Sequence, residues 1–228
     1  MSGDIVWTEA VVQATRELTP SVREFTLATT RPSLPYAAGS HLQVELLING
    51  QPQTRSYSLI GQDDDGLYRI AVKQLPLGRG GSLAMWRLAP GDLLRVGAPR
   101  NFSPLSLTAP GYLLMAGGIG ITPLVLMAQT LAKRGAPARL VQGARTLSEL
   151  AYGDVLRAAL GDRLTQVVDE RVERIDFAGE IAALPLGGQL YVCGPAPMLE
   201  AARQAWANAG RPAHDLRFET FGSSGHLA

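Results

Sequence analysis

The stretch "YLLMAGGIGITPLVLMAQTLAKRG", residues 112–135, contains a glycine-rich motif in the C-terminal half of the chain. Its first six residues indicate a buried strand, and the run after the three closely spaced glycines has the length of a helix, with Pro123 in its first turn. A strand that leads through glycines into a helix is typical of a phosphate-binding turn, because free backbone N–H groups at a helix start favour anions. The spacing is tighter than G-x-G-x-x-G, so an ordinary tight turn is an equally good interpretation of this stretch alone.

A second stretch, "YVCGPAPMLEAA" at 191–202, repeats the order of strand, glycine and helix. Two such strands in one parallel sheet bring their glycines to the same carboxyl edge, where open α/β sheets bind ligands. A dinucleotide fits this arrangement. Cys193, just before the glycine, is interpreted first as a small buried residue and second as a reactive thiol.

The rest of the chain divides into two kinds of pattern. Between 108 and 228, apolar strand-like runs alternate with helix-length stretches, which predicts a doubly wound, mainly parallel α/β sheet. Between 1 and 107, short segments such as "HLQVELLI" and "LYRIAVK" are separated by turn clusters, which predicts an antiparallel β-barrel or sandwich. We therefore expect a two-domain α+β chain, with "LSLTAP" at 105–110 as the connection.

Composition excludes several classes of function. The formal net charge is +1 in 228 residues, and no basic tract is present, which argues against a nucleic-acid or anionic-membrane surface. No apolar run is long enough to span a bilayer, and the N-terminus has no signal-peptide pattern, so we expect a cytoplasmic protein. A single cysteine cannot form an intramolecular disulfide or hold an iron–sulfur cluster with four thiolates, and the three histidines have no zinc-site spacing.

Two further stretches in the N-terminal half combine charge, hydroxyls and glycine. "RSYS" at 55–58 places a cation, an aromatic ring and two hydroxyls on one predicted strand. "GRGGS" at 78–82 precedes a short helix-like run and suits a phosphate group, and the alternative is that Ser82 is merely a helix N-cap. A flavin needs a cation for its phosphate, a ring against its plane and a hydroxyl at its edge. An exposed strand with an ordinary arginine and tyrosine is the alternative for "RSYS".

Taken together, the segments "RSYSL", "IAVKQ…GRGGS", "PRNFSPL", "AGGIGITP", "YVCGP" and "FETFG" occur in the order found in the ferredoxin–NADP reductase superfamily. The chain most closely resembles the group of phthalate dioxygenase reductase and vanillate demethylase reductase. The resemblance covers nearly the whole sequence, and six ordered motifs are far more specific than one.

The resemblance implies a set of site residues in each half. Flavin contacts are expected at Arg55, Ser56, Tyr57, Ser58, Val72, Lys73, Arg79, Gly80, Gly81 and Ser82. Nicotinamide-nucleotide contacts are expected at Gly117, Gly118, Gly120, Thr122, Arg145, Cys193, Gly194, Pro195 and Met198, with Phe221 against the flavin. Arg55 would bind the flavin phosphate, Tyr57 would pack on the ring, and Ser58 would bond near N5. The residues expected at the reacting atoms are Ser58, Thr122, Glu219 and Phe221.

The resemblance also implies the cofactors and partners. FMN is favoured over FAD, because no aromatic platform for an adenine is evident. NADH is favoured over NADPH, although Arg145 could contact a 2′-phosphate. Relatives in the closest group continue after "FETFG" into a ferredoxin domain, whose cysteines are missing here. Electrons are therefore expected to pass to a ferredoxin or a Rieske-type oxygenase, or to a domain outside this sequence.

The function implied is an NAD(P)H-dependent flavin reductase component of a multicomponent oxygenase. No general base is needed, because the chemistry belongs to the two cofactors and the chain has only to bind and orient them. Two alternatives stay open. One is a free flavin or ferric reductase without a protein partner, and the other is a non-catalytic nucleotide-binding subunit.

Overall fold

The computed structural model describes residues 5–61 and 65–221 and divides into two compact units, Met1–Pro104 and Leu105–Ala228. The connecting stretch 105–110 is tied to the second unit by two hydrogen bonds to tyrosine hydroxyls. Ser106 N donates to the hydroxyl of Tyr191 (2.8 Å), and Ala109 N donates to that of Tyr112 (3.0 Å).

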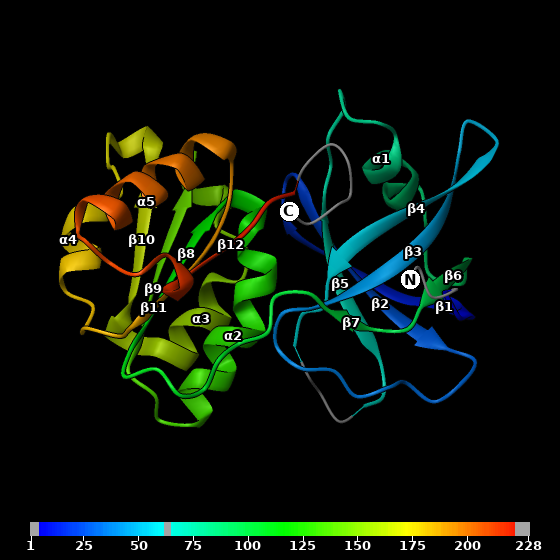
Figure 1. The fold of residues 1–228 in the computed structure, drawn as a ribbon. Coiled ribbons are helices and arrows are strands. Elements are labelled where there is room, and N and C mark those ends of the chain that lie inside the picture. Colours follow the sequence, from blue (N-terminus) through cyan, green and yellow to red (C-terminus); the bar gives the residue numbers. More distant parts are fainter. Residues whose placement is uncertain (1–4, 62–64, 222–228) are drawn as a thin grey trace. The chain divides into compact units, whose positions relative to one another are not determined.

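In its described residues, the first unit is built from antiparallel strands and one short helix (Figure 1). The elements are β1 (Trp7–Thr19), β2 (Val22–Thr29), β3 (Ser40–Ile48), β4 (Gln51–Ser58), β5 (Tyr68–Lys73), α1 (Gly81–Trp86), β6 (Leu93–Gly97) and β7 (Arg100–Asn101). Within the described residues, the ladder runs β4-β3-β6-β1-β2-β5, with β7 paired to β3. An antiparallel bridge between Leu59 and Ile70 joins the two ends of this order, which closes the sheet into a barrel.

The barrel core explains why these segments become strands. Apolar residues at alternate positions turn inward, and fully buried ones come from β1, β2, β3, β5 and β6: Val12, Phe25, Leu27, Leu42, Val44, Ile70 and Val96. Met85 from α1 completes this core. The prediction of an antiparallel barrel or sandwich is confirmed as a barrel. Strand β1, which has 13 residues, was not predicted.

The hairpin of β3 and β4 fixes the register of the "RSYS" strand. Asn49 and Gly50 both have positive φ (53° and 74°), as a two-residue type I′ turn requires. Ile48 is therefore paired with Gln51, and the pairing continues without a shift to His41 and Ser58. Strand β4 begins directly after Gly50.

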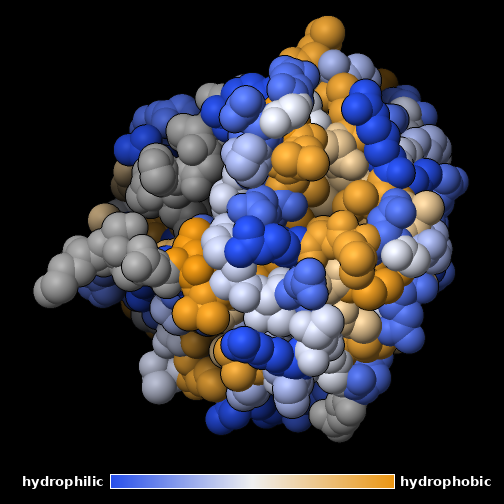
Figure 2. Space-filling model, turned by 90° about the vertical axis from the view of Figure 1, so that its right-hand side faces the viewer, coloured by the Kyte–Doolittle hydropathy of each residue, from blue (hydrophilic) through white to orange (hydrophobic). Residues whose placement is uncertain are grey.

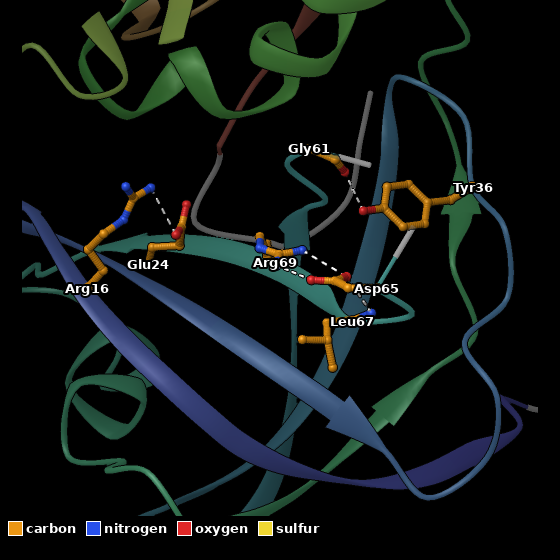
Figure 3. A network of polar contacts seen from close by, with 7 residues as sticks. All are labelled: Arg16, Glu24, Tyr36, Gly61, Asp65, Leu67 and Arg69. Atoms are coloured by element: carbon orange, nitrogen blue, oxygen red, sulfur yellow. Dashed lines mark hydrogen bonds and ion pairs between the residues drawn. The ribbon is translucent and has the colours of Figure 1, made fainter. Parts of the chain in front are cut away.

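Side chains tie down the segments around the β4–β5 connection (Figure 3). The hydroxyl of Tyr36 donates to the carbonyl of Gly61, and Arg69 pairs with Asp65. The hydrogen bond from Arg69 lowers the pKa of Asp65, so this carboxyl stays ionised. Tyr36 and Tyr68 also contact each other at 5.9 Å between ring centroids. The Tyr36 side chain is thus bonded to the segment after β4 and packs against the Tyr68 ring.

The second unit is a parallel α/β sheet (Figure 1). Its elements are β8 (Tyr112–Gly117), α2 (Thr122–Lys133), β9 (Ala138–Ala144), α3 (Gly153–Leu160), β10 (Leu164–Val168), α4 (Phe177–Ala182), β11 (Gln189–Cys193), α5 (Ala196–Asn208) and β12 (Leu216–Glu219). The strand order in the described residues is β10-β9-β8-β11-β12, and every pair is parallel. Helices α2 and α3 pack together on one face, and α4 and α5 pack on the other. The predicted doubly wound sheet is confirmed.

Arg211 holds the end of α4 against α5. Its guanidinium donates to three carbonyls at the end of α4, those of Ile181 (2.9 Å), Leu184 and Pro185 (2.7 Å), and lies over the ring of Trp206 at 5.8 Å. The carbonyls of Ile181 and Pro185 also accept hydrogen bonds from Leu184 N (3.2 Å) and Gly188 N (3.0 Å), so the cationic donor adds a second bond to each and complements the helix dipole.

We expect Arg211→Ala to destabilise the second unit by about 2 kcal/mol, because charge-assisted hydrogen bonds to partly buried carbonyls are lost. Urea unfolding followed by circular dichroism measures this. The matched control is Arg203→Ala on α5, whose exposed pair with Glu200 (3.2 Å) should contribute about 0.5 kcal/mol or less. Equal effects of the two replacements would contradict the capping role of Arg211.

One face of the molecule shows apolar side chains interspersed with hydrophilic ones (Figure 2). The first unit exposes large apolar residues on separate elements, among them Leu47 in β3, Leu93 in β6 and the fully exposed Leu77. Single exposed apolar residues are normal on protein surfaces. Among the described helices, none is long and apolar enough to cross a membrane.

Candidate flavin and nucleotide sites

Arg55 and the glycine turn at 79–81 form one structure in the first unit. From β4, the guanidinium donates to the carbonyl of Thr54 (2.9 Å), to Oε1 of Gln53 (2.8 Å) and to the carbonyl of Arg79 (3.3 Å). A Cβ on Gly81 would lie 2.5 Å from Nε of Arg55, so only glycine permits this approach. The cation is therefore fixed beside the turn, as a phosphate site requires.

The hydroxyl of Ser82 has a role that neither sequence interpretation anticipated. Gly80, with φ of 81°, occupies the N-cap position of α1, so the N-cap interpretation of Ser82 is wrong. Ser82 Oγ instead accepts a hydrogen bond from Leu75 N at 3.0 Å and holds the loop between β5 and α1. The side chain of Arg79 is exposed, and its carbonyl meets Arg55.

The remaining residues of "RSYS" differ in their surroundings. Tyr57 packs against the barrel core, and burial raises the pKa of its phenol, while the charge of Arg55 opposes that shift. Tyr57 is therefore a neutral ring at physiological pH. Ser56 is half-buried, whereas Ser58 is 3% exposed, and its Oγ lies 3.3 Å from Nε2 of His41.

The end of β5 carries Val72 and Lys73. The carbonyl of Val72 accepts a hydrogen bond from Nε1 of Trp86 at 3.0 Å, and Arg23 stacks on the indole at 4.4 Å. Trp86 in α1 thus anchors the helix to the strand at the position where backbone contacts to a flavin are expected. Lys73 is half-buried and is the last residue of β5.

In the second unit the two glycine turns pack directly against each other. A Cβ on Gly120 would lie 2.1 Å from the carbonyl oxygen of Cys193. A Cβ on Gly117 would lie 2.6 Å from Sδ of Met198, and one on Gly194 would lie 2.7 Å from the same sulfur. These glycines are therefore required by the contact between the turns that follow β8 and β11.

Gly118 differs from the other glycines of this turn. Its φ is +55°, and a Cβ there would meet nothing within 4 Å. Access of a ligand to the backbone at Gly117, Gly118 and Gly120 stays a prediction, and Gly118 is the one of the three at which an added Cβ would meet no neighbouring atom. Thr122 is buried at the start of α2, where its hydroxyl donates to the carbonyl of Ile119 at 3.0 Å.

Cys193 and Glu219 face each other at the carboxyl edge of the sheet. They are register partners on β11 and β12, and both are at least 95% buried. Burial, and secondarily the charge of Glu219, raises the pKa of the Cys193 thiol well above its ordinary value. The thiol is therefore neutral at physiological pH, which favours the interpretation as a small buried residue over the reactive one.

The remaining predicted site residues are exposed or half-exposed. Arg145 follows β9 with an exposed side chain, and its carbonyl accepts a hydrogen bond from Glu170 N at 3.0 Å. The carboxylate of Glu170 in turn accepts from Leu147 N at 2.7 Å. Pro195 is exposed at the N-cap of α5, and the side chain of Phe221, at the end of the described residues, is 44% exposed.

Two residues of these sites were not predicted from the sequence. Trp86 lies six residues after Gly80 with no motif of its own, so no local signal identifies it. His41 is different, because the "NG" at 49–50 predicts a two-residue hairpin and thereby places residue 41 opposite Ser58. Among the described residues, no cluster of histidine, cysteine or carboxylate side chains has the arrangement of a metal site.

Comparison with known proteins places these features in a family. Residues 9–102 match the family model described as an oxidoreductase FAD-binding domain. The chain is 40% identical over 204 residues to the heme-dependent oxidative N-demethylase beta subunit of Ectopseudomonas mendocina, covering 86% of this chain and 65% of that protein. It is 30% identical to the carnitine monooxygenase reductase subunit of Escherichia coli, covering 93% of this chain and 68% of the relative.

The solved structure of phthalate dioxygenase reductase has the same fold. Its TM-score is 0.85 at 29% identity, and the match covers 95% of this chain and 68% of that one. The chain thus spans about two thirds of the length of these three relatives. From the barrel, the doubly wound sheet and these matches, we conclude that the chain belongs to the ferredoxin reductase-like superfamily, to which oxygenase reductase subunits also belong.

Proposed function

We propose that the chain is the flavin- and nicotinamide-binding part of an oxygenase reductase. It takes hydride from NADH onto FMN and passes single electrons to an iron–sulfur protein or domain. The observation that carries this proposal is the packing of the Arg55 guanidinium on Gly81, which holds a cation beside a glycine turn. A core arginine has no need of such a turn, whereas a cofactor phosphate needs both its charge and its backbone access.

Residues of β4 fit the rest of a flavin. The neutral ring of Tyr57 offers an apolar face, and the buried hydroxyl of Ser58 offers a donor or an acceptor. Arg55 binds the phosphate in this proposal, with Gly80 and Gly81 closing the turn. FMN is proposed rather than FAD, because Tyr36 and Tyr68 contact each other and the Tyr36 hydroxyl is bonded to Gly61. The two rings therefore do not form an open platform for an adenine.

The second unit fits a nicotinamide nucleotide. Gly118 leaves its backbone open next to α2, a helix of 12 residues, and this helix start suits a diphosphate. NADH is proposed over NADPH. Arg145 would favour a 2′-phosphate. The carboxylate of Glu170, however, accepts a hydrogen bond from Leu147 N, two residues after Arg145, and its negative charge would repel that phosphate.

A bound flavin would accept two electrons at once and release them one at a time. The chain's own residues bind and orient the two cofactors and exclude water from them. Glu219 and Cys193 contribute a buried acid and a neutral thiol at the edge of the second sheet, and neither is required as a base. Thr122 keeps its proposed role beside the nicotinamide, and the role of Phe221 stays the one that the resemblance implies.

The electron acceptor is proposed from the relatives. Several of them are named as monooxygenase reductase subunits, and one is named vanillate O-demethylase oxidoreductase. The phthalate dioxygenase reductase structure is described as a modular one for electron transfer from pyridine nucleotides to [2Fe-2S]. A ferredoxin or a Rieske-type oxygenase is the acceptor that this likeness supports.

The decisive experiment is the absorption spectrum of the purified chain, followed by acid release and identification of its flavin. We expect bound FMN, bleached by NADH under anaerobic conditions and more slowly by NADPH. A colourless protein that turns over added FMN as a substrate would instead indicate a free flavin reductase. Bound FMN that NADH does not bleach would indicate a non-catalytic nucleotide-binding subunit, and absence of any flavin interaction would overturn the proposal.

A further inference from the structure

His41 and Ser58 form a buried polar pair inside the first unit. Both side chains are 3% exposed, and Nε2 of His41 lies 3.3 Å from Oγ of Ser58. None of the cofactor-binding motifs contains His41. A histidine buried this deeply beside a proposed cofactor residue calls for a physical role.

The backbone holds the pair in place. His41 and Ser58 are direct partners in the β3–β4 ladder, whose register is set by the two-residue turn at 49–50. On its other side His41 is the ladder partner of Arg100 in β7. Phe102 lies against the imidazole with 6.2 Å between ring centroids. The imidazole is thus fixed by strand pairing and by ring packing.

The chemistry of the two groups is complementary. A serine hydroxyl has one proton to donate and two lone pairs, while a neutral imidazole nitrogen either donates or accepts according to its tautomer. When Nε2 carries the proton it donates to Ser58 Oγ, which leaves the serine proton free for another acceptor. When Nε2 is bare it accepts the serine proton, which leaves the serine lone pairs free for another donor. The tautomer of His41 therefore decides whether the Ser58 hydroxyl is available as a hydrogen-bond donor or as an acceptor.

We propose that His41 is a positioning residue that sets the hydrogen-bonding direction of the Ser58 hydroxyl toward the flavin. The inference rests on the proposed function, in which Ser58 contacts the flavin edge. Oxidised and reduced flavins differ at that edge, since one accepts a hydrogen bond where the other donates. A residue that directs Ser58 will therefore change the relative affinity for the two forms, which is a property distinct from turnover.

The test measures the dissociation constants of oxidised and reduced FMN, together with the visible spectrum of the bound flavin. We expect His41→Leu to change the ratio of the two constants by about fivefold, the equivalent of roughly one hydrogen bond. His41→Gln, whose amide both donates and accepts, should restore much of the wild-type ratio. His214→Leu is the matched control, because His214 lies in the second unit with an 81% exposed side chain.

A double-mutant cycle separates a role through Ser58 from a merely structural one. In a Ser58→Ala background, His41→Leu should change the ratio no further. A full additional change in that background, or no change in the wild-type background, overturns the inference. If His41→Leu does not fold, His41→Gln and His41→Asn carry the same cycle, with Gln expected to lie closer to wild type. A wild-type chain that binds no FMN overturns the proposed function as well, whereas a normal wild type with an unresponsive His41 overturns this inference alone.

Discussion

Replacing Gly120 with alanine is expected to unfold the second unit or to abolish its binding of NADH. The new Cβ would lie 2.1 Å from the carbonyl oxygen of Cys193 and 2.9 Å from Gly194 N, which are backbone atoms of the neighbouring turn. Relief requires moving the end of β11 away from the start of α2, so we expect a cost of about 3 kcal/mol or more. Thermal unfolding by circular dichroism and calorimetric titration with NADH measure the two effects.

The matched replacement is Gly118→Ala, two residues earlier in the same turn. Its Cβ would enter open space, and only the positive φ of 55° opposes it, at about 1 kcal/mol. The two alanine variants thus separate the loss of stability caused by close packing from the loss caused by backbone conformation. Equal stability of the two variants would contradict the interlocked arrangement of the glycine turns.

Replacing Arg55 with alanine is expected to weaken FMN binding by about thirtyfold, or about 2 kcal/mol, because a charge-assisted contact to the phosphate is lost. Quenching of FMN fluorescence on binding measures the affinity, and thermal unfolding checks the barrel. Gly81→Ala should act in the same direction without removing the charge, since its Cβ would displace the Arg55 side chain.

Arg95→Ala is the control for the loss of a barrel arginine. Arg95 lies in β6, half-exposed, with an ion pair to Glu45 at 2.8 Å. Its removal should leave the affinity for FMN unchanged. An Arg55→Ala variant that retains FMN as well as the Arg95→Ala variant does would show that Arg55 is not the phosphate ligand.

Local patterns predicted most of the architecture. Alternating apolar residues identified β2, β3 and β5, and the order of strand, glycine and helix predicted both the parallel sheet and the edge where β8 and β11 end. Strand β1 was not predicted, because its pairing with β2 has register shifts between Val12 and Ala14 and between Glu17 and Thr19. Each irregularity disturbs the two-residue period, so the sequence shows no sustained alternation.

The site was predicted less completely, because its details depend on contacts between distant segments. Nothing near Gly120 reveals that Cys193 will press against it, and nothing near Ser82 reveals that its hydroxyl will bind Leu75 N. His41 was within reach, because the hairpin signal at 49–50 gives its partner by counting along the two strands. In the sequence-based prediction, turns only separate the predicted strands, and residue 41 is therefore not paired with Ser58.

The pairing of β1 with β6 has a consequence for biosynthesis. Trp7 lies opposite Gly97, so the first strand made needs the last long strand of its unit before its second edge is covered. At translation speeds of about 5 to 20 residues per second, this interval is roughly 5 to 20 s. During that time β1 has one partner edge open, and a nascent chain with an open strand edge is exposed to chaperones and to pairing with other chains.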